Sequence, residues 1–207
     1  MPAMDRKERD KQLRRTDILK AAERVFATKG YHKTTISDIA EEAQYAVGTL
    51  YIYFKDKPTL YLTLIEKKSK DLIATVKEKV NQISDIKEKI RVLVETQLSY
   101  FKENEDFFRI YFSEREGVRW TIKDKISRTA VETFLKYIDY IAELVKNAQL
   151  KGIIKKKLDS KQVAYILAAM MNAVIMPWLR EQSLERKEIK DLSGFILEIF
   201  YDGVGKR

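Results

Sequence analysis

Residues 34–60, which read TTISDIAEEAQYAVGTLYIYFKDKPTL, decide the fold of this chain. Apolar residues recur there at i, i+3, i+4 and i+7 in two successive sets: Ile36, Ile39, Ala40 and Ala43, and then Val47, Leu50, Tyr51 and Phe54. With this spacing, each set lines one side of a helix of about two turns. The short gap between the sets predicts a helix-turn-helix. Its second helix presents the opposite side to a partner, which for this motif is the major groove of DNA.

The neighbouring segments supply the helices that such a motif needs. A helix is expected from about Arg9 to Lys29, and Gly30 is expected to end it. Either Thr34 or Thr35 caps the next helix, and Asp56 caps a fourth helix that continues to about Gln82. Pro58 falls in the first turn of that fourth helix, where proline is tolerated.

The remainder of the chain also predicts helices. We expect them from Ser84 onward, after an Asn104 cap, from Ile122 to Leu150 with a stop at Gly152, from Asp159 or Ser160 with a kink at Pro177, and from Lys187 to Tyr201. The predicted fold class is therefore all-α, with a three-helix N-terminal domain on a C-terminal helical bundle. We place the domains at residues 1–60, including a basic arm at 1–15, and at residues 61–207.

Composition agrees with this fold class. Only seven Gly and three Pro occur in 207 residues, while 45% of the residues are hydrophobic and 34% are charged. The chain has no Cys, and no apolar run reaches the roughly 18 residues that span a bilayer. The first 15 residues lack the apolar core of a signal peptide, so we expect a cytoplasmic protein that does not enter a membrane.

The net charge of +9 favours an anionic partner. Residues 1–60 hold twelve Lys and Arg against nine Asp and Glu, which leaves only +3 of the total in that part. Charge therefore permits nucleic-acid binding, but the motif locates it. The basic arm from Arg6 to Arg15 either tracks DNA or is a solvated chain end, and the lysines between Lys151 and Lys161 are expected to form a solvated loop.

The residues of this stretch resemble the DNA-binding domain of the TetR family of bacterial transcription regulators. The family pattern runs T-T-hydrophobic-x-x-I-A-x-x-A, a turn, and x-G-x-L-Y-x-Y-F-x-x-K-x-x-L, and it is matched here by Thr34, Thr35, Ile36, Ile39, Ala40, Ala43, Gly48, Leu50, Tyr51, Tyr53, Phe54, Lys57 and Leu60. The resemblance is specific over about residues 13–62. The chain departs from it in the turn, where Gln44, Tyr45 and Ala46 replace the usual Gly-Val-Ser. This change removes a flexible glycine and a capping hydroxyl.

The resemblance implies which residues grip DNA. Combined with the outward side of the second helix, it gives the predicted DNA contacts Thr35, Tyr45, Ala46, Gly48, Thr49, Tyr51, Tyr53, Lys55 and Lys57. Thr49 offers a hydroxyl or a methyl group to base edges, and Tyr53 offers its hydroxyl to a phosphate. Tyr51 stays open between the two sides, since its spacing also suits the core.

Aromatic and methionine residues gather in the C-terminal part. At helical spacing they form either a plain core or the lining of a pocket, and the resemblance implies a cavity for an effector. The predicted effector-binding residues are Gln97, Phe101, Phe108, Tyr111, Phe112, Tyr137, Met171, Asn172 and Trp178, with Phe107, Tyr140, Met170 and Glu114 as further candidates. The expected effector is a largely apolar small molecule. A long acyl chain, carried as a coenzyme A thioester, is favoured over a planar cationic drug.

These observations predict a homodimeric repressor that leaves a palindromic operator when the effector binds. We expect the last two long helices to form the dimer interface. The alternative is a helical interaction protein whose helix-turn-helix no longer reads DNA, for which the atypical turn is the best argument. Catalysis finds no support, since His32 is the only His and no phosphate loop or nucleophile motif occurs; we expect no cofactor, no metal and no enzyme.

Overall fold

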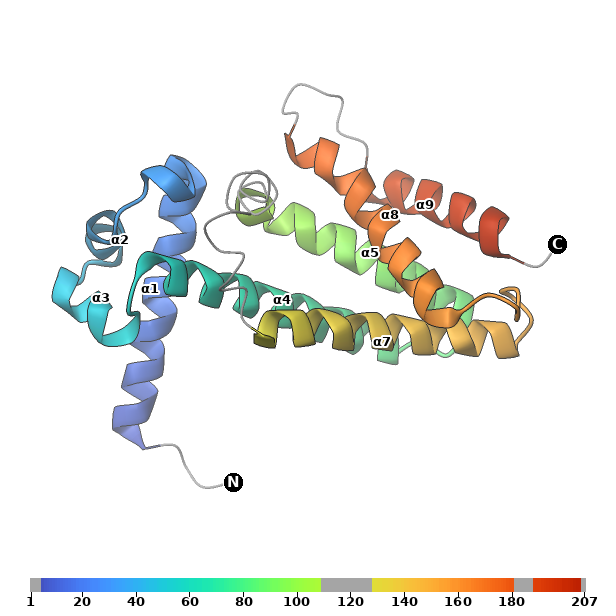
Figure 1. Cartoon of the computed structure of the whole chain (residues 1–207), viewed down its shortest axis with the longest axis horizontal. Helices are drawn as coiled ribbons and strands as arrows, with labels where there is room; N and C mark the ends of the chain where they lie inside the picture. The colour runs from blue at the N-terminus through green and yellow to red at the C-terminus, as the bar shows by residue number, and fades with distance from the viewer. Residues whose placement is uncertain (1–4, 109–127, 181–187, 206–207) are drawn as a thin grey trace. The chain divides into compact units, whose positions relative to one another are not determined.

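The computed structural model describes residues 5–108, 128–180 and 188–205 (Figure 1). The helices are α1 (Arg6–Lys33), α2 (Ile36–Ala43), α3 (Val47–Tyr53), α4 (Lys57–Asn81), α5 (Ile86–Glu103), α7 (Arg128–Leu150), α8 (Ser160–Arg180) and α9 (Ile189–Val204). The all-α prediction is confirmed. Two compact units divide the chain: one contains α1 to α3 with the first part of α4, and the other contains the rest of α4 with α5, α7, α8 and α9.

In the first unit, α1 packs on α2, and α2 packs on α3. Ile18, Ala22 and Phe26 of α1 are fully or almost fully buried, as their spacing predicts. Gly30 leaves the helical path with φ 74° and ψ 162°, a conformation that favours glycine, before a last turn continues to Lys33. Next to this residue, the ring of Tyr31 contacts the ring of Tyr61 in a tilted arrangement, with centroids 4.7 Å apart and an interplanar angle of 45°.

The predicted basic arm is helical. Residues from Arg6 onward belong to α1, and the side chains from Arg6 to Arg14 are exposed. The predicted start at Arg9 falls inside this helix, because the charged residues before it show no apolar periodicity. Lys and Arg are nevertheless good helix formers, and they extend the helix outward from its packed part.

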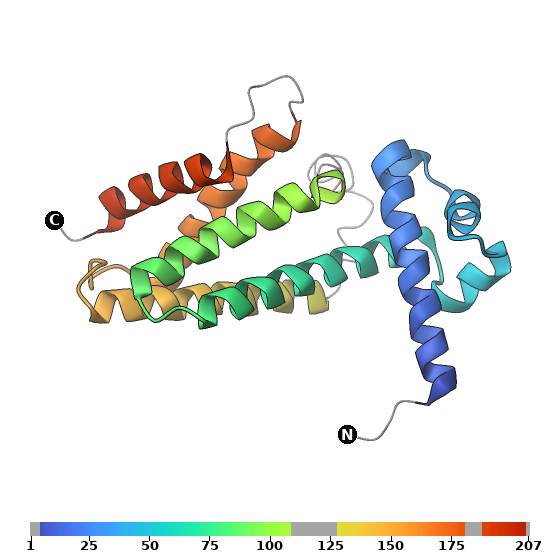
Figure 2. The same ribbon diagram turned by 180° about the vertical axis from the view of Figure 1, so that it is seen from behind.

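In the second unit, α5 contacts α7, α8 and α9, and α8 packs against both α7 and α9 (Figures 1 and 2). The core includes Leu93 and Leu98 of α5, Val145 of α7 and Leu167 of α8, all with no exposed surface. Asp85 caps α5 and Asp159 caps the first turn of α8, each by accepting a backbone N–H bond. Within the helices that the structure describes, none is long and apolar enough to cross a membrane.

The sequence predicts a helix stop at Gly152 and a kink at Pro177. Gly152 adopts φ 73° directly after α7, and the N–H of Ile153 returns to the Ala148 carbonyl at 2.9 Å, so this stop is confirmed. Pro177 lies inside α8, which continues beyond it to Arg180. Asn104 closes α5: its side-chain amide donates to the Tyr100 carbonyl at 2.8 Å, and its Oδ1 accepts from Lys68 Nζ at 2.6 Å.

The described end of the chain is fastened to the loop between α7 and α8. Gly205 forms an isolated antiparallel bridge with Ile154, and Lys155 Nζ donates to the Gly203 carbonyl at 3.1 Å. The Gln149 side chain orders the same loop by donating to the carbonyls of Lys155 and Leu158. The exit of α9 is therefore tied to this loop.

Candidate functional site

The first helix of the helix-turn-helix begins with a reciprocal cap. The Asp38 N–H donates to Thr35 Oγ1 at 3.1 Å, and the Thr35 N–H donates to Asp38 Oδ2 at 2.8 Å. Lys29 Nζ donates to the other oxygen of Asp38 at 2.7 Å. These hydrogen bonds, first that of Lys29 and then those of Thr35, lower the pKa of Asp38 from 3.8 to about 2. The cap therefore fixes both the start of α2 and its position against α1.

The atypical turn keeps the geometry of the motif. Gln44 adopts a left-handed conformation with φ 57° and ψ 39°, and it is the only non-glycine residue with positive φ in the described ranges. The Tyr45 N–H returns to the Ala40 carbonyl at 2.9 Å. Ala46 begins α3 without a side-chain cap, as the missing hydroxyl predicts. The turn thus forms without glycine, although the left-handed region is energetically unfavourable for a residue with a side chain.

α3 is attached through few residues and is otherwise open. Leu50 and Phe54 are buried, with 1% and 2% of their surfaces exposed, while Ile52 is 77% exposed. The prediction that Val47 belongs to the buried side is wrong, since it is 39% exposed, and Tyr51, which the spacing left open between the two sides, is 54% exposed. A helix of seven residues touches its neighbours over one narrow strip, so the flanks of the predicted apolar side remain in solvent.

The other predicted DNA contacts differ in exposure. Thr35, Ala46, Gly48 and Lys55 are exposed, and Tyr45, Thr49 and Tyr53 are half-buried. Tyr45 Oη lies 3.5 Å from Asp17 of α1. Arg15 of α1 lies over the Phe54 ring at 5.1 Å, which holds a cation next to the end of α3.

Lys57 has a role that the sequence analysis missed. Its Nζ donates to the carbonyl oxygens of Tyr31 at 2.9 Å, Thr34 at 2.8 Å and His32 at 3.3 Å. The same ammonium lies 4.6 Å from the centre of the Tyr31 ring. The positive charge thus closes the C-terminal end of α1, where free carbonyls favour a cation. No local signal reveals this contact, because the partners lie 23 to 26 residues earlier in the chain.

Among the predicted effector residues, the structure joins two by a hydrogen bond. Tyr137 Oη of α7 donates to Gln97 Oε1 of α5 at 2.6 Å, and both side chains are buried. Burial, and secondarily the nearby Tyr140, raise the pKa of Tyr137. The hydroxyl oxygen of Tyr140 is itself buried and has no hydrogen-bond partner among the described residues. The interior of this bundle therefore contains polar groups between its apolar helices.

The remaining candidates are distributed as follows. Phe101, Phe107, Phe108 and Met171 are buried, and Met170 and Asn172 are half-buried. Tyr111, Phe112 and Glu114 lie outside the described residues, and for Trp178 only the helical backbone is described.

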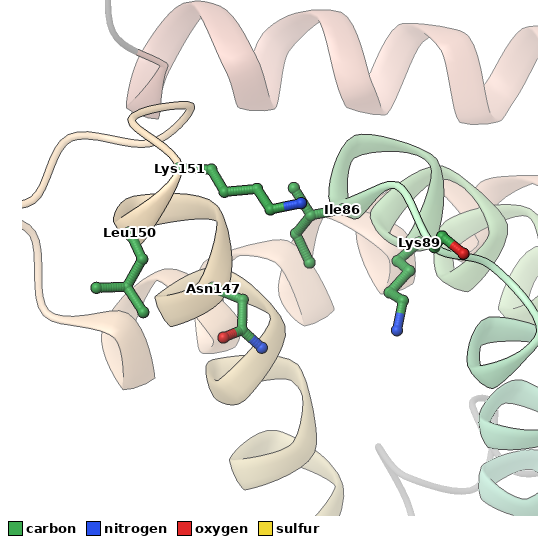
Figure 3. Close-up of a pocket in the computed structure, with 6 residues that line it drawn as sticks. Ile86, Lys89, Asn147, Leu150 and Lys151 are labelled. Carbon is green, nitrogen blue, oxygen red and sulfur yellow. The ribbon is translucent and has the colours of Figure 1, made fainter.

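A pocket opens where α5 begins and α7 ends. Its lining includes Ile86 and Lys89 of α5, Asn147 and Leu150 of α7, and Lys151 just after α7 (Figure 3). None of the predicted effector residues lines it. Its lining lacks the aromatic and methionine side chains on which the effector prediction rested.

Groups suited to metal binding do not gather in the described ranges, where no cluster of three His, Cys, Asp or Glu side chains occurs. His32 is exposed in the last turn of α1, and its ring centre lies 5.5 Å from that of Tyr31.

Comparison with known proteins assigns both parts of the chain. Residues 18–64 match the model of bacterial regulatory proteins of the tetR family, and residues 65–201 match the model of the C-terminal region of YsiA-like proteins. The fatty acid metabolism regulator protein of Bacillus subtilis (strain 168) is 23% identical over 187 residues, which cover 90% of this chain and 93% of that protein.

Two solved structures share the fold. FadR from Bacillus halodurans, a fatty acid degradation regulator, superposes with a TM-score of 0.77 at 21% identity, covering 90% of this chain and 94% of that one. The transcriptional regulator FadR from Bacillus subtilis, in complex with stearoyl-CoA, superposes with a TM-score of 0.76 at 22% identity, covering 91% and 98%.

Proposed function

Because this chain belongs to the tetR family of bacterial regulatory proteins, it is a DNA-binding transcription regulator and not an enzyme, and we propose that it represses genes of fatty acid metabolism. DNA binding is supported most directly by α3, in which Leu50 is buried while Val47, Tyr51 and Ile52 are exposed. The process it regulates rests on the relative from Bacillus subtilis. The relatives give no support to the alternative of an interaction protein that no longer reads DNA.

We propose the predicted DNA contacts with revised roles for Tyr51 and Lys57. Tyr51 joins the outward side of α3, and Lys55 is the exposed cation after it. Lys57 acts first on the end of α1, and its effect on DNA is through the position of α4. The other proposed contacts are Thr35, Tyr45, Ala46, Gly48, Thr49 and Tyr53.

The same proposal includes a homodimer on a palindromic operator. Large apolar side chains are exposed on α8 and α9, including Ile166, Phe195 and Ile199 at 53%, 54% and 48%. α8 packs against α9 within the unit, so a second copy would cover residues of both helices. Two copies double the contacts of one short recognition helix. A regulator of chromosomal DNA acts in the cytoplasm, which is where we place it.

The proposed effector is a long-chain acyl coenzyme A. The Bacillus subtilis FadR structure contains stearoyl-CoA, and the bundle of this chain buries aromatic, methionine and amide side chains in the matching region. We propose that Gln97 and Tyr137, which form a buried hydrogen bond with each other, orient such a ligand. The ligand releases DNA only to the extent that it binds the DNA-free arrangement more tightly than the DNA-bound one.

A mobility-shift assay with DNA from beside its own gene tests the proposal. We expect the protein to shift that DNA to a slower band. Stearoyl-CoA should abolish the shifted band, and coenzyme A without an acyl chain should have no effect. Stearoyl-CoA at 100 times its Kd should also stabilise the fold by about 2.7 kcal/mol. A DNA shift that stearoyl-CoA does not reverse would contradict the proposed effector but not the proposed DNA binding. The absence of any DNA shift would contradict the whole proposal.

A further inference from the structure

We propose that Ile52 reads thymine methyl groups in the operator and sets its sequence preference. This inference rests on the proposed DNA binding by α3. Ile52 has the largest exposed fraction among the large apolar side chains of the described residues, 77%. It lies on a helix whose buried anchor, Leu50, has 1% of its surface exposed. On a helical wheel Ile52 and Gly48 both lie about 160° from Leu50, so they form the centre of the outward side.

The composition of α3 limits the chemistry of base recognition. Its seven residues, VGTLYIY, contain no Arg, Lys, Asn, Gln, Asp or Glu. The paired hydrogen bonds by which Arg recognises guanine and Asn or Gln recognises adenine are therefore not available from this helix. The remaining hydrogen-bonding groups are the hydroxyls of Thr49, Tyr51 and Tyr53. The thymine C5-methyl group is the apolar feature of the major groove, and apolar side chains recognise it by direct contact.

Gly48 makes room for this contact. Gly48 lies one turn before Ile52 on the same side of α3, and a helical side chain leans toward the N-terminus of its helix. Gly48 is exposed, and a Cβ added there would meet no atom within 4 Å. Glycine is thus not required by packing in the free protein. Because Gly48 has no side chain, the surface beside Ile52 is open to the approach of a base.

The test begins with selection of a bound sequence from a random duplex DNA pool by the full-length wild-type protein. In the selected duplex, deoxyuridine then replaces each thymidine in turn, in both half-sites, which removes the C5-methyl group and keeps base pairing. At one position per half-site we expect the wild-type affinity to fall about fourfold per methyl group, about fifteenfold for the pair. Ile52→Ala should bind the thymidine and deoxyuridine duplexes equally, because the partner of the methyl group is gone.

Two further variants complete the design. Leu150→Ala, at a residue that is also largely exposed but lies at the end of α7, should keep the full wild-type discrimination. Gly48→Ala should leave the melting temperature unchanged or raised, since alanine favours a helix, while it weakens operator binding at least fivefold.

The outcomes separate this inference from the function on which it rests. If the wild-type protein selects an operator but Ile52→Ala discriminates thymidine from deoxyuridine as well as wild type does, the role of Ile52 is refuted and DNA binding stands. If no deoxyuridine substitution weakens the wild-type complex, methyl recognition is refuted. If no sequence is selected from the pool, both the inference and the proposed function fall.

Discussion

At the scale of single residues, Gln44 carries a conformational cost that the protein does not need. Its φ of 57° lies in the left-handed region, which L-residues with a side chain occupy at a cost of about 1–2 kcal/mol. Glycine avoids this cost but loses more entropy on folding. We therefore expect Gln44→Gly to raise the free energy of unfolding by about 0.5–1 kcal/mol. Urea titration at constant m-value measures it.

A matched control for this substitution exists in α8. Gln162→Gly makes the same chemical change in the first turn of a helix, and it should lower the free energy of unfolding by about 1 kcal/mol. Equal effects of the two substitutions would show that the backbone at Gln44 bears no strain.

Lys55 and Lys57 form a natural comparison, since both flank the start of α4 but only Lys57 donates to the end of α1. We expect Lys57→Met to lower the free energy of unfolding by about 2 kcal/mol, because three carbonyls lose a charged donor. Lys55→Met, on an exposed side chain, should change it by less than about 0.5 kcal/mol. Thermal unfolding of both variants measures the difference.

The same two variants separate folding from DNA contact. Lys55→Met should reduce the slope of log affinity against log salt by about 1, as expected for one lost phosphate contact. An unchanged salt slope for this variant would remove Lys55 from the interface.

At the scale of helices, the cap of α2 makes the first unit sensitive to acid. The pKa of Asp38 is lowered to about 2 by its hydrogen bonds in the folded state, from an ordinary value of 3.8. A lowered folded-state pKa means that the unfolded chain binds a proton first on acidification. The stabilisation is therefore complete above about pH 4 and is lost as the pH falls toward 2.

Asp38→Asn tests this dependence. The variant should melt at a lower temperature than wild type at pH 6, and the difference should shrink steadily between pH 4 and pH 2. The neighbouring exposed carboxylate in Glu41→Gln serves as the control. A constant difference across that range would show that the carboxylate charge of Asp38 does not stabilise α2.

Helix ends could be predicted from the sequence where the residues that determine them lie within a few positions. Asp56 caps α4 by accepting from the Thr59 N–H at 2.7 Å, and Gly152 ends α7, since both effects act within a few residues. The side of α3 that faces the core could not be predicted as well. Two turns contain too few residues to decide between Leu50 alone and the wider strip with Val47 and Tyr51.

Contacts between segments far apart in the chain could not be predicted from the sequence pattern. Polar Gln97 and aromatic Tyr137 were both predicted to serve an effector, but nothing in the spacing showed that they bind each other across α5 and α7. The bond of Lys57 to the end of α1 is of the same kind. Both contacts depend on tertiary packing, because the partners are far apart in the sequence: 40 positions for Gln97 and Tyr137, and about 25 for Lys57 and the end of α1.

At the scale of the whole molecule, exposed apolar side chains on α9 support the proposed dimer. A carboxylate buried without a partner at a subunit interface is costly, so Phe195→Glu and Ile199→Glu should each convert a dimer to monomers. Leu150→Glu, at a residue that is 69% exposed on α7, should leave the dimer intact. Sedimentation velocity at micromolar concentration measures this. A wild-type protein that sediments as a monomer would contradict the dimer.

The absence of charge on α3 separates how the protein finds an operator from how long it stays there. Long-range attraction to DNA accelerates arrival, and in this protein it has to come from cations outside α3, because α3 has none. Short-range apolar contacts act after docking, on the rate of departure. Substitutions within seven residues can then change which sites retain the protein without slowing its search. Duplicated copies of such a gene can therefore come to bind different operator sequences while their rates of association with DNA change little.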